Sequence, residues 1–269
     1  MAVTNYAWPP MDGRKVVGKS ISRVDGTLKS SGKAKYASDQ NPEGLLFAVL
    51  LTSPHAHAII KHLDASAAKA MSGVTAIELI AKTGTELQWA GQEIAAVAAI
   101  SEEIARDAAR AIRVEYEVLP HVVKEEDIAK VGDRGKPAGE KVAGDPDDAF
   151  KKAAAVHEGR YGIAVITHCC LEPHGQVIQW KDDKIMFWPS TQNVSGIAGD
   201  LAKALEIPEA NITVEMQMIG GGFGSKFASD SWGQAAARLS KASGGRPVKL
   251  FLDRADELAS AGERPSAYA

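Results

Sequence analysis

The chain has 269 residues, of which 45% are apolar and 24% charged, and its formal net charge is -3. This composition is typical of a globular protein, and the slightly acidic balance removes the usual electrostatic reason to expect binding to nucleic acid or to an anionic membrane. No apolar run approaches the roughly 20 residues of a membrane span. The two cysteines, Cys169 and Cys170, are adjacent, which excludes a disulfide scaffold and a four-cysteine iron–sulfur site within the chain.

The first part of the chain is predicted to be an arm followed by a small α/β domain. Residues 1–27 are punctuated by Pro and Gly and show no hydrophobic periodicity, which indicates an arm. From residue 28 strands and helices are predicted in alternation, so we expect an α/β domain over 28–125. Its predicted strands are 45–51, 74–80, 94–100 and 113–118, and its predicted helices are 66–70 and 102–112, the second capped by Ser101.

The remaining residues are predicted to form a linker and a second domain. Residues 126–150 are charged and rich in Gly, Pro and Asp, as linkers are. The domain over 151–269 is predicted to contain a hairpin (177–180 with 185–188), strands 212–218 and 248–252, a helix from Asn193 or Ser195 to 206, and a helix over 229–243. The order strand, glycine run, helix, strand indicates a βαβ unit. Because no closing element precedes residue 269, we expect a partial domain.

The glycine run Gly220-Gly221-Gly222-Phe223-Gly224-Ser225-Lys226 lies between a predicted strand and a predicted helix. Without side chains, the backbone can approach a ligand closely, and successive N–H groups can face an anion beside a helix N-terminus. A phosphate or pyrophosphate is the natural ligand of such a loop, although the run fits neither the Rossmann nor the Walker A pattern. The alternative interpretation is a tight structural turn.

A second polar segment, Ser190-Thr191-Gln192-Asn193, also lies between a predicted strand and a predicted helix, where sites are common. Gln192 carries a donor and an acceptor and can therefore hydrogen-bond an oxygen atom of a ligand. The alternative is ordinary helix capping by Thr191 or Asn193.

Two segments contain residue types that bind metals. His168-Cys169-Cys170-Leu171-Glu172-Pro173-His174 does not have the spacing of zinc sites, so buried structural cysteines and a hydrogen-bonded Glu172 are favoured. His55 and His57 are predicted to share one face of a strand end, but no third ligand is nearby. The sequence therefore predicts no metal site made of protein side chains.

Eight short motifs follow one another along nearly the whole chain: Arg23-Val24-Asp25-Gly26, Gly32-Lys33-Ala34-Lys35-Tyr36, Ser53-Pro54-His55-Ala56-His57-Ala58, Gly91-Gln92, Leu171-Glu172-Pro173-His174, Ser190-Thr191-Gln192-Asn193, Gly220–Gly224 and Gly245-Arg246-Pro247-Val248. In this order they resemble the start of the molybdopterin-binding large subunit of the xanthine dehydrogenase/aldehyde oxidase family, the molybdenum hydroxylases. The similarity is closest to bacterial members that oxidise aldehydes.

The resemblance implies a mixed α/β fold, with an α/β hammerhead domain over 28–125 and the first part of a molybdenum-cofactor-binding domain over 151–269. It implies a molybdenum–pterin cofactor, which bacterial members often carry in the cytosine dinucleotide form. The dithiolene of the cofactor holds the metal, so no protein ligands are expected. Gln192 matches a glutamine that hydrogen-bonds an oxo group of the metal, and Gly221, Gly222, Phe223 and Gly224 match the loop beside the metal centre.

The reaction implied by the resemblance is hydroxylation of an aldehyde or N-heterocycle with oxygen from water, and the electrons leave through Fe–S clusters. Phe227 occupies the position at which xanthine-type members carry a glutamate, which favours aldehydes over purines. The family's catalytic base is a glutamate near the C-terminus of a longer chain, so no residue here is assigned that role. We therefore expect this chain to be a split subunit or a truncated piece that is inactive alone.

The expected partners are a second chain that carries the rest of the cofactor domain, an Fe–S subunit and, as in some members, an FAD subunit. The first residues lack the layout of a signal peptide, so we expect a cytoplasmic location. The alternative is export to the periplasm with a partner that carries the signal. Two other functions are considered: a non-catalytic scaffold or binding module that retains the fold, and an unrelated nucleotide-binding α/β protein.

Overall fold

The computed structural model describes residues 8–136 and 139–268 and divides the chain into two units, 1–35 and 36–269. In the first unit the described residues form a 3₁₀ turn η1 (Met11–Gly13) and a short helix α1 (Gly26–Ser30), neither of which buries a side chain. The expected arm over 1–27 therefore has little regular structure from residue 8 onward. Residues 1–7, which the same prediction covers, lie outside the described residues.

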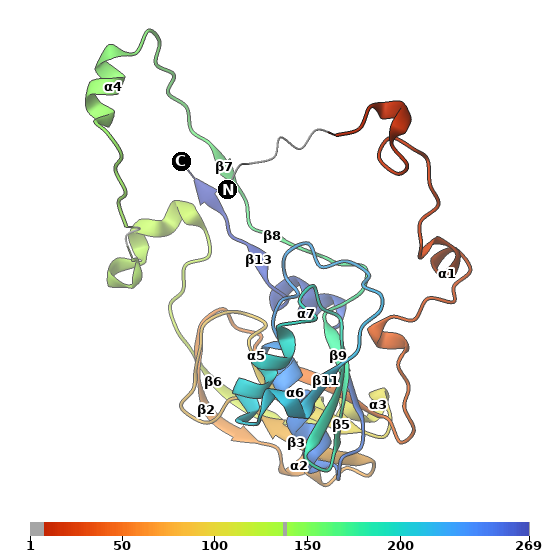
Figure 1. Cartoon of the computed structure of the whole chain (residues 1–269). Coiled ribbons are helices and arrows are strands. Elements are labelled where there is room, and N and C mark those ends of the chain that lie inside the picture. Colours follow the sequence, from red (N-terminus) through yellow and green to blue (C-terminus); the bar gives the residue numbers. More distant parts are fainter. Residues whose placement is uncertain (1–7, 137–138, 269) are drawn as a thin grey trace. The chain divides into compact units, whose positions relative to one another are not determined.

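The second unit contains strands and helices from Tyr36 onward (Figure 1). The strands are β1 (Leu46–Thr52), β2 (Ala58–Asp64), β3 (Val74–Leu79), β4 (Glu86–Leu87), β5 (Glu93–Ala99), β6 (Arg113–Val118), β7 (Gly162–Ile163), β8 (Ile166–Thr167), β9 (Gly175–Lys181), β10 (Lys184–Pro189), β11 (Ile212–Val214), β12 (Val248–Phe251), β13 (Glu263–Arg264) and β14 (Ala267–Tyr268). The helices are α2 (Ser66–Lys69), α3 (Glu102–Ala111), α4 (Pro146–Lys152), α5 (Ile197–Leu205), α6 (Asp230–Ala242) and α7 (Arg254–Ala259), with 3₁₀ turns η2 (Ala37–Asp39), η3 (Glu125–Lys130), η4 (Gly132–Arg134) and η5 (Glu209–Asn211).

One mixed sheet joins the two halves of the chain. Among the described residues its strand order is β11-β10-β9-β12-β1-β5-β3. β1 pairs in parallel with β12, with Leu46 opposite Val248, and antiparallel with β5. Strands of the expected hammerhead range and of the expected cofactor-domain range thus share one sheet, while the boundaries at 125 and 151 stay predictions.

The two faces of this sheet are covered by different helices. β5 is buried along its whole length, as its continuous apolar sequence predicts for a strand covered on both sides. Ala96 and Ala98 belong to the larger core, to which α6 contributes, whereas Ala95 and Val97 belong to a second core, to which α3 contributes. Because successive side chains of a strand point to opposite faces, α3 and α6 lie on opposite sides of the sheet.

The predicted cap of α3 is confirmed, and the predicted cap of α5 is wrong. The Ser101 hydroxyl accepts the Ile104 N–H at 3.3 Å. The N-cap of α5 is Gly196, which provides no side-chain cap, rather than Asn193 or Ser195. Asn193 is engaged elsewhere, since its side-chain amide donates to the Phe227 carbonyl at 3.1 Å.

A smaller sheet of order β4-β2-β6 lies in the same unit. The sequence does not predict β2, because the register shift between Ile60 and His62 interrupts the alternation of buried and exposed residues. β11 is shorter than the predicted 212–218, since it ends at Val214. No helix within the described residues is long and apolar enough to cross a membrane.

Three short elements lie in the predicted linker, namely η3, η4 and the start of α4. α4 buries no residue. Residues 137 and 138 of the linker lie outside the described residues. Beyond the linker, β8 pairs with β13 and β7 pairs with β14 in two antiparallel ribbons.

Candidate functional site

The glycine loop and the 190–193 segment, which are separate motifs in the sequence, lie against each other. The Gln192 backbone N–H donates to the Lys226 carbonyl at 2.7 Å. The side-chain oxygen Oε1 of Gln192 accepts the Gly224 N–H at 2.9 Å and the Lys226 N–H at 3.4 Å. The loop therefore wraps around one glutamine side chain.

These contacts fix the orientation of the Gln192 amide. A backbone N–H only donates, so the atom facing Gly224 must be the oxygen of the amide and not its nitrogen. None of the described residues hydrogen-bonds Nε2 of Gln192, and the residue is exposed. Gln192 thus keeps two N–H donors for an oxygen atom of a ligand.

Glycine at position 222 lets the loop and the Gln192 amide lie against each other as they do. A Cβ at Gly222 would overlap the Gln192 amide. Gly221 and Gly224 have φ angles of +109° and +101°, which residues with a side chain rarely adopt. Phe223 has a φ of +52° and is 62% exposed, so the single aromatic ring of the loop points outward.

The middle of the loop has unpaired donors. The N–H groups of Gly221, Gly222 and Phe223 donate to no atom of the described residues, although Gly222 is buried. An unpaired buried N–H costs about 1–3 kcal/mol unless a ligand supplies an acceptor. Together with the Gln192 amide, these groups form a donor set that suits a ligand rich in oxygen acceptors.

The helix terminus predicted beside the loop does not contribute to this donor set. α6 begins at Asp230, well beyond Gly224. The side chain of Asp200, a residue of α5, lies at the N-terminus of α6. Its carboxylate accepts both the N–H and the hydroxyl of Ser229, the N-cap residue of α6, at 2.7 and 2.6 Å. A protein carboxylate therefore occupies the helix N-terminus that the sequence predicts to assist anion binding at the loop.

The 168–174 segment contacts the glycine loop through the Glu172 side chain. Oε2 of Glu172 accepts the Gly220 N–H at 2.5 Å, which confirms the predicted hydrogen-bonded Glu172, and Oε1 has no partner among the described residues. Both cysteines are free. Cys170 is buried as predicted, but the prediction is wrong for Cys169, which is exposed. The φ of Cys169 is +46°, so the chain does not continue there as a buried strand.

A buried histidine connects this segment to α7 and to the loop. Nδ1 of His174 lies 2.9 Å from Oε1 of Glu257, and Nε2 lies 2.8 Å from the Ser225 hydroxyl. Burial by itself raises the pKa of Glu257, but the hydrogen bonds from His174 and the charges of His174 and Lys226 together leave that pKa lowered. The sequence offers no signal for Glu257, because 83 residues separate it from His174.

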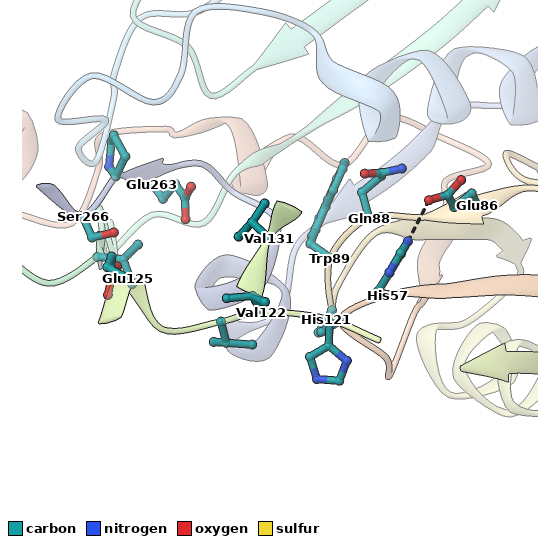
Figure 2. A pocket seen from close by; sticks show the side chains of 15 residues that line it. His57, Glu86, Gln88, Trp89, His121, Val122, Glu125, Val131, Glu263 and Ser266 are labelled. Carbon is teal, nitrogen blue, oxygen red and sulfur yellow. Dashed lines mark hydrogen bonds and ion pairs between the residues drawn. The ribbon is translucent and has the colours of Figure 1, made fainter. Parts of the chain in front are cut away.

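The metal interpretations find no support within the part of the chain that the structure describes, where no group of three or more His, Cys, Asp or Glu could hold an ion. Nε2 of His57 pairs with Oε1 of Glu86 at 2.7 Å, and Nδ1 contacts the Pro120 carbonyl. Figure 2 shows this pair at the wall of a pocket of about 610 Å³ that Trp89 also lines. His55 packs edge-on against the ring of Tyr116.

Two protein families match the chain. Residues 131–269 match the molybdopterin cofactor-binding domain, and residues 31–84 match the a/b hammerhead domain of aldehyde oxidase and xanthine dehydrogenase. The first match covers more than half of the chain and shows a molybdopterin cofactor-binding domain. Together the two matches show that the chain belongs to the aldehyde oxidase/xanthine dehydrogenase family. The predicted family and fold class are thereby confirmed.

Individual relatives agree with this assignment. The chain is 31% identical over 263 residues to the aldehyde oxidoreductase molybdenum-binding subunit PaoC of Escherichia coli K12, an alignment that covers 91% of this chain and 36% of PaoC. It is 30% identical over 270 residues to the xanthine dehydrogenase/oxidase of Mus musculus, covering 93% of this chain and 20% of that protein.

A solved structure extends the similarity to the fold. Quinoline 2-oxidoreductase from Pseudomonas putida 86 matches with a TM-score of 0.77 and 28% identity, over 91% of this chain and 35% of that chain. The chain therefore spans about a third or less of the length of these relatives.

Proposed function

We propose that this chain is the part of a molybdenum hydroxylase that presents the glycine loop and Gln192 to a molybdenum–pterin cofactor, and that the complete enzyme oxidises aldehydes. In such a reaction the aldehyde carbon gains a hydroxyl oxygen from water and loses hydrogen, giving a carboxylic acid, two protons and two electrons. The electrons pass to Fe–S clusters on a partner chain. The chemistry of oxygen insertion and electron transfer is supplied by the bound cofactor.

The observation that carries the proposal is the donor set around Gln192. The amide oxygen is held by the loop, so Nε2 stays available and would donate to an oxygen of the bound cofactor. The unpaired N–H groups of 221–223 lie in the same loop. These residues fit an oxygen-bearing anionic cofactor: they would bind and orient it, and the missing side chain at Gly222 leaves room for the Gln192 amide against the loop.

The preference for aldehydes is proposed from Phe227. Its ring is 51% exposed and its carbonyl is fixed by Asn193. An apolar ring at the position where xanthine-type members carry a glutamate gives a purine no charged or hydrogen-bonding partner. The name of the relative from E. coli, an aldehyde oxidoreductase subunit, agrees with this preference.

The partners are proposed from the same family. They are a second chain that supplies the remainder of the cofactor domain, an Fe–S subunit and an FAD subunit, with the cofactor in its cytosine dinucleotide form. The relative PaoC is itself named as a molybdenum-binding subunit, which supports an assembly of several chains. We propose a cytoplasmic location, with export alongside a signal-bearing partner as the alternative.

The first test is molybdenum content in protein purified gently from its native host. Elemental mass spectrometry should give close to one molybdenum per chain, and intact mass spectrometry of the same sample should show an Fe–S subunit and a chain with the remaining cofactor domain. A native assembly without molybdenum and pterin would contradict the proposal and favour a non-catalytic scaffold.

The second test addresses the substrate. In the complete enzyme, Phe227→Glu should lower kcat/KM for benzaldehyde relative to hypoxanthine by about tenfold, because an apolar aldehyde offers the new carboxylate no hydrogen-bond donor whereas the N–H groups of a purine do. Phe150→Glu in α4, where Phe150 is also exposed, is the matched control and should change neither value. Equal selectivity in all three proteins would contradict the proposed role of Phe227.

A further inference from the structure

Lys226 is a buried lysine directly after the glycine loop. It is 1% exposed, which is unusual because a lysine is rarely fully buried without partners. Burial lowers the pKa of its ammonium group, while the Glu172 carboxylate, with Oε2 at 3.9 Å from Nζ, acts in the opposite direction. The proposed function gives this side chain no role.

The ammonium group of Lys226 has three acceptors in three different places. Nζ donates to the Glu172 carbonyl at 2.7 Å, to the Pro173 carbonyl at 3.4 Å and to the Ser190 hydroxyl at 2.7 Å. A lysine ammonium carries three N–H donors. The three acceptors therefore match the protonated side chain, and an apolar replacement would leave them buried without a donor.

The backbone of the same residue binds Gln192. The Lys226 carbonyl accepts the Gln192 N–H at 2.7 Å and the Thr191 hydroxyl at 3.1 Å, and the Lys226 N–H donates to Oε1 of Gln192. Lys226 therefore joins three segments. Its side chain binds 171–174 and 190–193, and its backbone, which continues the glycine loop, binds 190–193 a second time.

We infer that Lys226 is the positioning residue of the site: its buried ammonium fixes the loop against the 172–173 carbonyls, and so sets the orientation in which Gln192 presents Nε2. The consequence of this inference for the cofactor rests on the proposed function. The Lys226 side chain is buried and acts through its contacts with the neighbouring segments.

The test compares three variants of the complete native assembly. Lys226→Met removes all three donors but keeps the length of the side chain. Ser190→Ala removes one acceptor and keeps the lysine, which guards against a Lys226→Met protein that does not fold. Lys249→Met is the control, because Nζ of Lys249 likewise donates hydrogen bonds, to the Ser38 carbonyl and to Asn41, but away from the loop.

The first readout does not depend on the cofactor. Hydrogen exchange of the Gly224 and Lys226 amides, the two donors to Oε1 of Gln192, should be about tenfold faster in Lys226→Met, about threefold faster in Ser190→Ala and unchanged in Lys249→Met. Exchange at the wild-type rate in Lys226→Met, or in Ser190→Ala should the first variant not fold, would overturn the inference. This holds even for an assembly that contains no molybdenum, in which case only the proposed function fails.

The second readout separates positioning from general stability. In variants that contain molybdenum and melt within a few degrees of wild type, the electron paramagnetic resonance signal of reduced molybdenum should be altered in Lys226→Met and unaltered in Lys249→Met. For an aldehyde substrate, kcat should fall about tenfold while KM changes less than threefold, since misplacement of an orienting group acts on the reacting geometry. A wild-type signal with a wild-type kcat in Lys226→Met would limit Lys226 to a structural role.

Discussion

Gly222 shows how one absent side chain organises the site. Its hypothetical Cβ would lie within the Gln192 amide, so Gly222→Ala must displace either the loop or the glutamine. We expect the free energy of unfolding to fall by about 1–3 kcal/mol and the molybdenum content of the native assembly to fall at least about tenfold. Both are measured on protein purified from the native host.

Gly139→Ala provides the control for this substitution. No heavy atom lies within 4 Å of a Cβ at Gly139, so the same change of residue type should alter neither quantity. Equal molybdenum content in the two variants would show that the loop tolerates a side chain at 222 and that the contact with Gln192 is not needed for the cofactor.

Asp230 makes stability depend on pH. Burial, with further repulsion from Asp200 and Glu93 and an opposing effect of His174, raises the pKa of Asp230 from 3.8 to about 6. At a pH between 3.8 and about 6, Asp230 is protonated more in the folded chain than in the unfolded chain. The free energy of unfolding therefore falls as pH rises from about 4 to about 6, and then levels off. Asp256, whose pKa burial and Asp253 also raise to about 6, contributes in the same direction.

Asp230→Asn should therefore stabilise the protein at pH 7 and not at pH 4. Allowing for partial solvent access, we expect a gain of about 1–2 kcal/mol at pH 7 in urea unfolding. Asp182→Asn is the control, since Asp182 is exposed and has a similar φ, +57° against +53° for Asp230. A gain of the same size at pH 4 and pH 7 would show that ionisation is not the cause.

At the residue scale, the sequence predicts the part of the site that local motifs encode. Gln192 and the glycines of the loop are visible as motifs, and the structure brings them together; their binding role stays a prediction. Lys226 appears in the sequence only as a residue that fails the Walker A pattern. Its proposed positioning role depends on the Glu172 and Pro173 carbonyls, more than 50 residues away in the sequence. No local sequence pattern encodes such contacts.

At the scale of elements, α3 and α4 offer a matched comparison of helix caps. Ser101 caps α3 and Asp145 caps α4 through side-chain hydrogen bonds. Since α3 buries Ala105, Ala108 and Ala109 while α4 buries nothing, only the first cap is coupled to global unfolding. Ser101→Ala should lower the free energy of unfolding by about 1 kcal/mol, and Asp145→Ala should leave it within about 0.3 kcal/mol.

Chemical denaturation monitored by tryptophan fluorescence measures the free energy of unfolding of both variants. A loss of about 1 kcal/mol in Asp145→Ala would mean that α4 unfolds together with the sheet, contrary to its lack of buried residues. α3 and β2 show where element prediction succeeds and where it fails. α3 has a cap, an acidic first turn and a regular apolar face, whereas β2 is hidden by a register shift that only its pairing with β6 reveals.

At the scale of the whole molecule, the shared sheet predicts the behaviour of a nicked chain. Lys141 is exposed in the predicted linker, so trypsin can cleave there. The fragments should remain together in size-exclusion chromatography, because β1 pairs with β12 and both parts contribute to one core. They should separate in about 6 M urea.

Fragments that elute apart without denaturant would contradict this prediction and would favour two independently folded domains. The sequence predicts the α/β class and the family from local patterns and motif order. It does not predict that β12 lies beside β1, because strand order depends on contacts between residues far apart along the chain.

The pairing of Leu46 with Val248 also determines how long β1 waits for its partner strand while the chain is being synthesised. A ribosome adds about 5–20 residues per second, so β1 emerges roughly 10–40 s before the strand that covers one of its edges. During this interval β3 and β5 can pair on the other side, while the edge that awaits β12 remains an apolar template open to other nascent chains. We therefore expect chaperones to bind the growing chain until residue 251 has left the exit tunnel. A product of interrupted translation that lacks β12 would keep the unpaired apolar edge of β1.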